Sequence, residues 1–208
     1  QAESIYQQIL EADADQPEAL HLLGVIAHQK GDHERSVDLI EKALTLKPDY
    51  AEAHCNLGIS YKELGRLDDA ATSCRRAIEI KPDYAEAHNN LGNILRELER
   101  LEEAVACYKN AIAIKPDYAE AYNNLGNALQ ELGRLEEAVD FIDKAIAIKP
   151  NYPEAYTSLG DAWQELGQMD KALTSYEKAL VNNPNLAETY NSIGTTLMYL
   201  GQFDEALE

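Results

Sequence analysis

The chain has 208 residues, of which 45% are hydrophobic, and it carries a formal net charge of −19 at pH 7. Binding to phosphate groups needs clustered Lys and Arg, so this acidity argues against nucleic acid and against anionic membrane surfaces as partners. The longest apolar runs are only a few residues, too short for a membrane-spanning helix. Basic peptides remain compatible partners, although acidity alone more often serves solubility.

Two sequence markers recur along the chain with a common period of 34 residues. The first is Leu-Gly, which occurs at Leu23-Gly24, Leu57-Gly58, Leu91-Gly92, Leu125-Gly126 and Leu159-Gly160, with Ile193-Gly194 as a sixth copy. The second is Lys-Pro, which occurs at Lys47-Pro48, Lys81-Pro82, Lys115-Pro116 and Lys149-Pro150. Two independent markers with one period indicate a tandemly copied unit, and such units stack on their neighbours without a central core.

In chain order, each unit begins with an Asp or Asn that is followed three residues later by Glu, which is the pattern of a capping box. We therefore expect first helices to start at Asp15/Glu18, Asp49/Glu52, Asp83/Glu86, Asp117/Glu120, Asn151/Glu154 and Asn185/Glu188. Each first helix buries a stripe that includes Leu-Gly, and the glycine suggests a close approach of two helices.

The first helices are expected to end at a residue with left-handed backbone, for which glycine is suited. These residues are Gly31, Gly65, Gly133, Gly167 and Gly201, whereas Glu99 interrupts the series and should cost roughly 1 kcal/mol if it is left-handed. A second helix follows in each unit, with small residues such as Ala104 and Ala111 on either side of Tyr108, and it ends before the proline of Lys-Pro.

These residues closely resemble the tetratricopeptide repeat, a helical hairpin with Leu-Gly in its first helix and two alanines and an aromatic in its second. The resemblance covers the whole chain. It implies an all-α, right-handed α-solenoid in which the first helices line a concave groove. Residues 1–16 are then the second helix of a truncated preceding repeat, and the N-terminal part of the full-length protein is expected to be missing. Complete repeats follow at 17–50, 51–84, 85–118, 119–152 and 153–186, with a truncated repeat at 187–208.

The face opposite the buried stripe of the first helices is rich in asparagine, a residue that competes with its own helical backbone. The expected peptide-binding residues on or beside this face are Asn56, Asn89, Asn90, Asn93, Asn123, Asn124, Asn127 and Asp161. Such a row of amides can bind the main chain of an extended peptide, because each amide offers both donors and an acceptor. The alternative is that duplicated repeats share polar filler that faces water. The row resembles the asparagine ladder in the tetratricopeptide region of O-linked N-acetylglucosamine transferase. The positions that match this ladder are Asn56, Asn90 and Asn124.

Only two cations, Lys62 and Arg96, are expected near this face, against at least one acid in each unit. We therefore expect neutral or basic peptides to bind better than an acidic C-terminal tail, which tetratricopeptide clamps hold with several Lys and Arg. At the N-terminal end, Leu22, Val25 and Ile59 form an apolar patch in the groove. This patch is either a contact site or a surface that a preceding repeat or a fused domain covers.

No phosphate-binding loop, nucleophilic serine elbow or zinc-protease motif occurs in the sequence, so we expect no catalysis, cofactor or metal site in this chain. His21 and Cys55 occupy equivalent places, but two groups do not complete a metal site. His28 and His33 are expected to be solvated beside a turn. His54, His88 and Trp163 are expected to fill space on the packed stripe.

Cys55, Cys74 and Cys107 lack the spacing of a zinc or redox motif, which favours a reducing compartment and a cytoplasmic location. The sequence thus predicts a non-catalytic interaction scaffold that holds extended peptides. The alternative is the substrate-recruiting arm of a larger enzyme such as a glycosyltransferase. Self-association through exposed terminal helices is a further expectation, because both ends of the chain cut a repeat.

Overall fold

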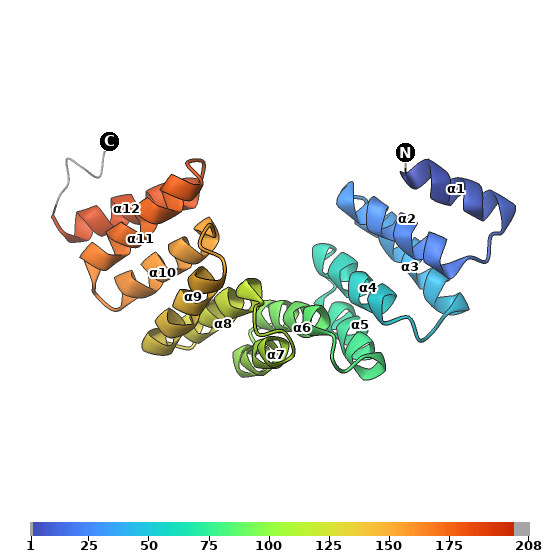
Figure 1. Ribbon diagram of the computed structural model, residues 1–208, viewed down its shortest axis with the longest axis horizontal. Helices are drawn as coiled ribbons and strands as arrows, with labels where there is room; N and C mark the ends of the chain where they lie inside the picture. Colours follow the sequence, from blue (N-terminus) through green and yellow to red (C-terminus); the bar gives the residue numbers. More distant parts are fainter. Residues whose placement is uncertain (1, 202–208) are drawn as a thin grey trace. The chain divides into compact units, whose positions relative to one another are not determined.

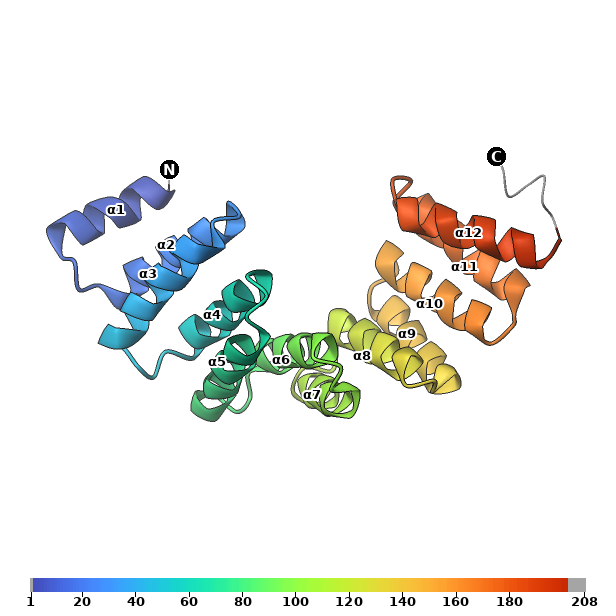
Figure 2. The same ribbon diagram turned by 180° about the vertical axis from the view of Figure 1, so that it is seen from behind.

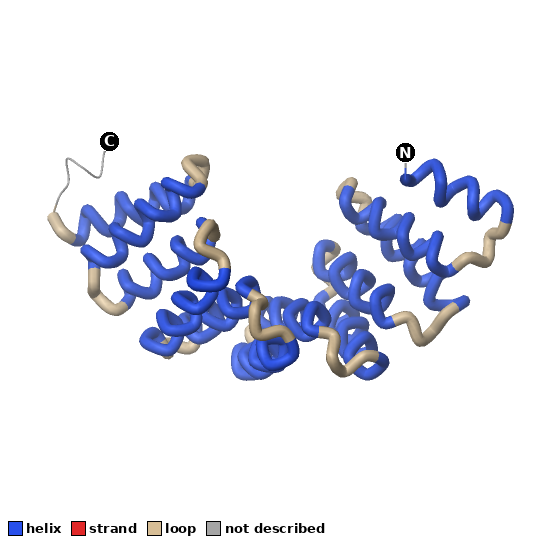
Figure 3. Tube along the Cα trace, in the orientation of Figure 1, coloured by secondary structure: helices blue, strands red, loops and turns tan. Residues whose placement is uncertain are grey.

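The structure is a computed structural model that describes residues 2–201. Within these residues it contains twelve α-helices and no β-strand (Figure 3). The prediction of an all-α protein is therefore confirmed. The last repeat is expected at 187–208. Its first helix is described, but its expected second helix lies outside the described residues.

The chain divides into two compact units, Gln1–Ile114 and Lys115–Glu208 (Figure 1). The first unit holds α1 (Ala2–Ala12), α2 (Pro17–Gln29), α3 (His33–Leu46), α4 (Ala51–Glu63), α5 (Leu67–Ile80), α6 (Ala85–Glu97) and α7 (Leu101–Ile114). The second holds α8 (Ala119–Glu131), α9 (Leu135–Ile148), α10 (Pro153–Glu165), α11 (Met169–Asn182) and α12 (Ala187–Tyr199).

Successive helices form hairpins that stack on one another within each unit. In the first unit α2 packs on α3, α4 on α5 and α6 on α7, and among the first helices α2 contacts α4 and α4 contacts α6 (Figure 2). The second unit repeats this arrangement, with hairpins α8–α9 and α10–α11 and with contacts that join α8 to α10 and α10 to α12. The predicted solenoid class is thus confirmed, because every hairpin buries its apolar stripe against its neighbours in the sequence.

The glycine of each Leu-Gly pair lies where the two helices of a hairpin come closest. A Cβ added at Gly92 would lie 2.5 Å from the ring of Tyr108, far inside van der Waals contact. The same holds for Gly24 against Ile40, Gly58 against Cys74, Gly126 against Ile142 and Gly160 against Tyr176. The predicted close approach is confirmed, and it explains why glycine stands in mid-helix despite a cost of about 1 kcal/mol relative to Ala.

The turn after each first helix contains a residue with left-handed backbone, as expected. Gly65 has φ 72° and Gly133 has φ 71°, while Glu99 at the equivalent place has φ 58°. Glu99 is the one non-glycine residue with positive φ among the described residues. Its side chain therefore carries the steric cost that glycine avoids at the other corners.

The predicted capping boxes are wrong. The first helices begin two residues after the expected Asp or Asn, so the N-cap of α4 is Tyr50 and that of α6 is Tyr84, and neither side chain caps its helix. Two of the first-turn glutamates instead pair with a lysine at the end of the second helix in the same hairpin. Glu18 pairs with Lys47 at 2.7 Å, and Glu52 pairs with Lys81 at 3.5 Å.

The lysine of each Lys-Pro pair also lies over an aromatic ring at the start of the next first helix. The Lys47 ammonium is 4.5 Å from the centroid of Tyr50, and that of Lys149 is 4.3 Å from the centroid of Tyr152. Lys81 over Tyr84 and Lys115 over Tyr118 repeat the contact. Such cation–π pairs contribute about 0.5–1 kcal/mol at exposed sites, so the second marker helps to join one hairpin to the next.

The left-handed backbone of Glu99 gives a direct test of the corner. Replacing Glu99 with Gly should raise the free energy of unfolding by about 1 kcal/mol, because the Cβ clash disappears. The measurement is urea unfolding followed by circular dichroism. The matched control is Gly133→Glu at the equivalent corner, which should lower stability by a similar amount. A Glu99→Gly protein no more stable than the parent would contradict this reading of the turn.

Candidate functional site

The outward face of the first helices presents half-buried polar side chains, which we call the polar row. In the first unit the row consists of Asn56, Asn90 and Asn93, and in the second unit of Asn124, Asn127 and Asp161. These six predicted site residues all lie on first helices, and each of them is half-buried.

Two members of the polar row bond to the preceding first helix. Asn56 Nδ2 lies 2.8 Å from His21 Nε2, and Asn90 Nδ2 lies 3.3 Å from Cys55 Sγ. In both pairs the amide is 35 residues after its acceptor, so the bond joins adjacent hairpins. We call this contact the amide tie. Each carboxamide carries two N–H donors and an acceptor oxygen, so one tie leaves an N–H and the oxygen available.

A second position of the polar row bonds within its own hairpin. Asn93 Oδ1 accepts from the Tyr108 hydroxyl at 2.8 Å, and Asp161 Oδ1 accepts from the Tyr176 hydroxyl at 2.8 Å. Burial raises the pKa of Asp161, although the Tyr176 and Ser192 hydroxyls act in the opposite direction. Each polar residue here therefore has a tyrosine as its partner on the second helix.

Asn127 occupies this same position but faces a different partner. The residue of α9 that lies against Gly126 is Ile142, which has no hydroxyl to donate. The structure shows no hydrogen bond from the Asn127 side chain to any residue between 2 and 201. Asn127 therefore presents a complete, half-buried amide to solvent.

Two of the expected binding residues are buried. Asn89 is fully buried and Asn123 is only 5% exposed. A ligand on the surface cannot reach the Asn89 side chain, so we remove it from the proposed contacts. Asn123 Oδ1 is buried without a hydrogen-bond partner in the described part of the chain.

The expected apolar patch is only half-buried and contributes to a pocket. Leu22, Val25 and Ile59 each retain part of their exposure. Val25 and Ile59, together with Ile40, are the apolar lining residues of a pocket of about 50 Å³. Its polar lining residues are His28, Ser36, Asn56 and Ser60.

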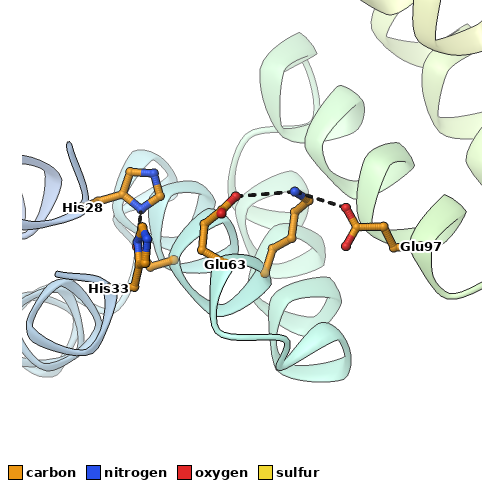
Figure 4. A network of polar contacts seen from close by, with 6 residues as sticks. His28, His33, Glu63 and Glu97 are labelled. Atoms are coloured by element: carbon orange, nitrogen blue, oxygen red, sulfur yellow. Dashed lines mark hydrogen bonds and ion pairs between the residues drawn. The ribbon is translucent and has the colours of Figure 1, made fainter. Parts of the chain in front are cut away.

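A second pocket of about 120 Å³ lies between α4 and α6. It is lined by Ile59, Lys62, Glu63, Asn90, Asn93 and Ile94. Its single lysine is neutralised, because the Lys62 ammonium pairs with Glu97 at 3.1 Å and with Glu63 at 3.4 Å (Figure 4). Arg96, the other expected cation, is half-buried and is also engaged with other groups. The two charged lining residues, Lys62 and Glu63, therefore balance each other, and Glu97 adds a negative charge beside the pocket.

His28 and His33 are not simply solvated, which corrects the prediction. Both are half-buried, and their Nδ1 atoms lie 3.2 Å apart (Figure 4). One of the two nitrogens must be unprotonated for this contact to be favourable. Burial lowers the pKa of His28 and the neighbouring His33 lowers it further, while Glu63 acts in the opposite direction.

The remaining aromatic and histidine predictions are partly wrong. His54 Nε2 lies 2.8 Å from the Pro48 carbonyl, and His88 Nε2 lies 3.1 Å from the Pro82 carbonyl, so both bond to a turn rather than only fill space. Trp163 packs on the core at one edge but remains half-exposed. The Lys171 ammonium covers its ring at 4.1 Å from the centroid.

Two features are absent from the described residues, namely a cluster of metal-ligating side chains and a membrane-spanning helix. Between residues 2 and 201, no three His, Cys, Asp or Glu side chains gather closely enough to hold a metal ion. None of the twelve described helices has the length and apolar character needed to cross a membrane. Cys55, Cys74 and Cys107 are free thiols, and burial raises the pKa of each, that of Cys107 to about 11.

Sequence reasoning missed the contacts that position the polar row. The sequence places His21 and Cys55 at equivalent positions, and in the structure each is the acceptor of an amide tie. The sequence offers one signal for these ties: each asparagine follows its acceptor by 35 residues, which is one repeat of 34 residues plus one position. Sequence reasoning also missed the buried pair Ser36 and Ser60, which line the first pocket and whose hydroxyl oxygens lie 2.8 Å apart.

The first amide tie predicts a pH dependence of stability. His21 must be neutral to accept from Asn56 at Nε2, and its Nδ1–H then donates to the Tyr50 hydroxyl at 3.0 Å. Burial lowers the pKa of His21 below its ordinary value of 6.5. The unfolded chain therefore binds a proton first as the pH falls, so stability should be full above 6.5 and decline as the pH drops through and below that value.

Thermal unfolding between pH 7.5 and 5.5 measures this effect, with His21→Gln as the comparison. Gln keeps a neutral amide that does not titrate, so its pH dependence in this range should be weaker than that of the parent. Both proteins should keep the part of the pH dependence of stability that comes from His28, because the causes that lower its pKa do not include His21. An unchanged pH profile in His21→Gln would show that protonation of His21 does not disturb the tie.

Comparison with protein families finds matches along most of the chain. The tetratricopeptide repeat matches residues 51–84, 119–152 and 153–186, and a second tetratricopeptide family matches 73–106 and 175–208. A further family described as a TPR repeat matches 26–65 and 92–133. No curated protein matches the chain.

Solved structures show the same fold. The chain is 30% identical to MamA, with a TM-score of 0.69, over 80% of this chain and 97% of MamA. It is 27% identical to PilW, a type IV pilus biogenesis factor, with a TM-score of 0.85 over 91% of this chain and 88% of PilW. A thermophilic TPR protein of Thermus thermophilus is 24% identical, with a TM-score of 0.74 over 88% of this chain and 100% of its own. With these matches and its stacked hairpins, the chain belongs to the tetratricopeptide repeat family.

Proposed function

We propose that the chain is a non-catalytic scaffold whose polar row binds the main chain of extended peptides, with neutral or basic peptides preferred. Tetratricopeptide repeats serve as protein-interaction scaffolds, and the proposal names the surface and the ligand class. The observation that carries it is the amide tie. Asn56 and Asn90 are each held by one N–H, with the other N–H and the oxygen unused by that bond.

The tie favours binding because it restricts the amide before a ligand arrives. A free asparagine on a helix surface loses side-chain entropy when it is fixed by a ligand, whereas a tied one has already lost much of it. The unused N–H can donate to a peptide carbonyl, and the oxygen can accept from a peptide N–H. These groups recur in every residue of an extended peptide, so such contacts do not depend on its sequence.

The charges of the first unit support a preference against acidic ligands. Lys62 is neutralised by Glu63 and Glu97, and the carboxylate side chains of both acids remain 42% exposed. The chain as a whole carries a net charge of −19. An acidic peptide would therefore meet uncompensated carboxylates, and a basic one would be attracted, with the difference largest at low salt.

Two further parts of the proposal concern location and self-association. The free thiols of Cys55, Cys74 and Cys107 support a reducing, cytoplasmic location.

Met198 and Tyr199 on α12 are 57% and 70% exposed, which supports self-association through this helix. Light scattering at increasing concentration tests the second point, and a monomer throughout would contradict it.

Asn127 provides the cleanest test of peptide binding, because its side chain makes no bond that a substitution would break. Asn127→Ala should weaken binding of a neutral extended peptide about three- to tenfold, the loss expected for one or two hydrogen bonds. Isothermal titration calorimetry measures the affinity. The control is Asn110→Ala, which removes an exposed asparagine from the second helix α7 and should leave the affinity unchanged.

The charge preference is tested with two peptides of equal length. A peptide of Ala, Ser and Lys should bind more tightly than one that ends in Glu-Glu-Val-Asp, and the ratio should fall as salt rises. Equal or stronger binding of the acidic peptide would overturn the charge preference. If neither peptide binds, the polar row is solvated filler and the proposed function fails.

A further inference from the structure

The second unit contains one place where an amide tie is missing. In the first unit the acceptors His21 and Cys55 are each bonded by an asparagine 35 residues later. The corresponding acceptor on α8 is Asn123, and the residue 35 positions later, on α10, is Ser158. Serine is too short to repeat the contact, and no hydrogen bond joins the Ser158 and Asn123 side chains, both of which the structure describes.

The missing tie leaves Asn123 Oδ1 without a partner. The residue is 5% exposed, and this oxygen is buried with no hydrogen bond in the described chain. An unsatisfied buried acceptor lowers the stability of the folded chain, so a donor that reaches it recovers that free energy. His21 and Cys55 are 4% and 2% exposed with their amides in place, so a deeply placed acceptor is normal at this position.

Two other polar groups without internal partners lie beside the missing tie. Ser158 is half-buried, and the structure shows no hydrogen bond from its hydroxyl within residues 2–201. Asn127 is four residues after Asn123 on α8, so the two side chains project from neighbouring turns of one helix face. Asn123, Asn127 and Ser158 are the group that we call the amide seat.

We propose that the amide seat binds an asparagine or glutamine side chain of the peptide ligand. The ligand's carboxamide N–H takes the place of the missing tie and donates to Asn123 Oδ1, while Asn127 and Ser158 bond its remaining groups. This inference rests on the proposed function, and it adds a side-chain preference to main-chain binding.

The chain itself indicates the chemistry of the occupant. At the two equivalent places, the group that satisfies the acceptor is a carboxamide that enters from the same face. A lysine ammonium is a poor substitute, because a charge in a site this buried loses its hydration without a counter-ion. A carboxamide is neutral and supplies a donor for Asn123 together with an acceptor for Asn127 or Ser158. The soft terminal torsion of Asn123 lets its oxygen turn toward the entering group.

The experiment uses two neutral extended peptides that differ at one residue, Gln in one and Met in the other. The parent chain should bind the Gln peptide about three- to tenfold more tightly in calorimetry, as expected for one or two hydrogen bonds. Ser158→Asn places an asparagine where it can form the missing tie to Asn123, so it should raise the midpoint of thermal unfolding. With the seat filled in this way, the affinities for the Gln and Met peptides should become about equal. Ser158→Ala is the matched control: it removes the hydroxyl without filling the seat, so a preference for Gln should remain.

The side-chain amide signal of Asn123 in NMR spectra gives a second readout, and it should shift with the Gln peptide but not with the Met peptide. Equal affinities of the two peptides for the parent chain would overturn the amide seat and leave main-chain binding intact, with water as the partner of Asn123. A Ser158→Asn chain that gains no stability would also overturn it, because the tie would not fit there. If neither peptide binds at all, the proposed function fails together with the seat.

Discussion

The close approach of two helices at the glycine of each hairpin is the constraint on which the rest of the structure depends. A Cβ at Gly24, Gly58 or Gly92 would lie 2.5 Å from a side chain of the second helix. The contact therefore requires that no side chain stands between the helices. Because the glycine recurs in every repeat, each hairpin closes in the same way, and the next hairpin meets a similar surface. The side chain that covers the glycine varies from Ile to Cys to Tyr without changing this rule.

This closure also decides which side chains are free to bind a ligand. Burial of the glycine face turns the polar row of each first helix outward, and the spacing of adjacent first helices lets an amide reach the acceptor 35 residues earlier. The amides are thus structural contacts and ligand-binding groups at once, since one N–H serves the tie and the rest of the group remains. The second unit departs from this pattern at two places. Asn127 lacks a tyrosine partner because α9 carries Ile142, and Asn123 lacks an amide tie because α10 carries Ser158, so polar groups are left without hydrogen bonds there.

Much of the fold could be predicted from periodicity, because a repeated sequence repeats its contacts. The mid-helix glycines, the left-handed turns and the strained Glu99 all follow from local rules about Cβ and backbone conformation. The capping boxes were wrong because one residue, a tyrosine in four of the six repeats, separates each Asp or Asn from the helix, so its side chain stands too far from the first turn. The site was harder to predict, since the roles of Asn56, Asn89 and His28 depend on distances between helices. A helical wheel places residues around one helix and contains no such distances.

The close approach is tested most directly by a double-mutant cycle at Gly126 and Ile142, measured as free energies of unfolding. Gly126→Ala should destabilise by about 1–3 kcal/mol despite the higher helix propensity of Ala, because the new methyl group would collide with Ile142 and lies near the Ala138 carbonyl. Ile142→Ala alone should cost about 2–5 kcal/mol through the cavity it leaves. In the double variant the methyl group enters that cavity, so the combined loss should be smaller than the sum by at least about 1 kcal/mol. Additive losses, or a Gly126→Ala chain more stable than the parent, would show that close approach at this glycine does not control the packing of the hairpin.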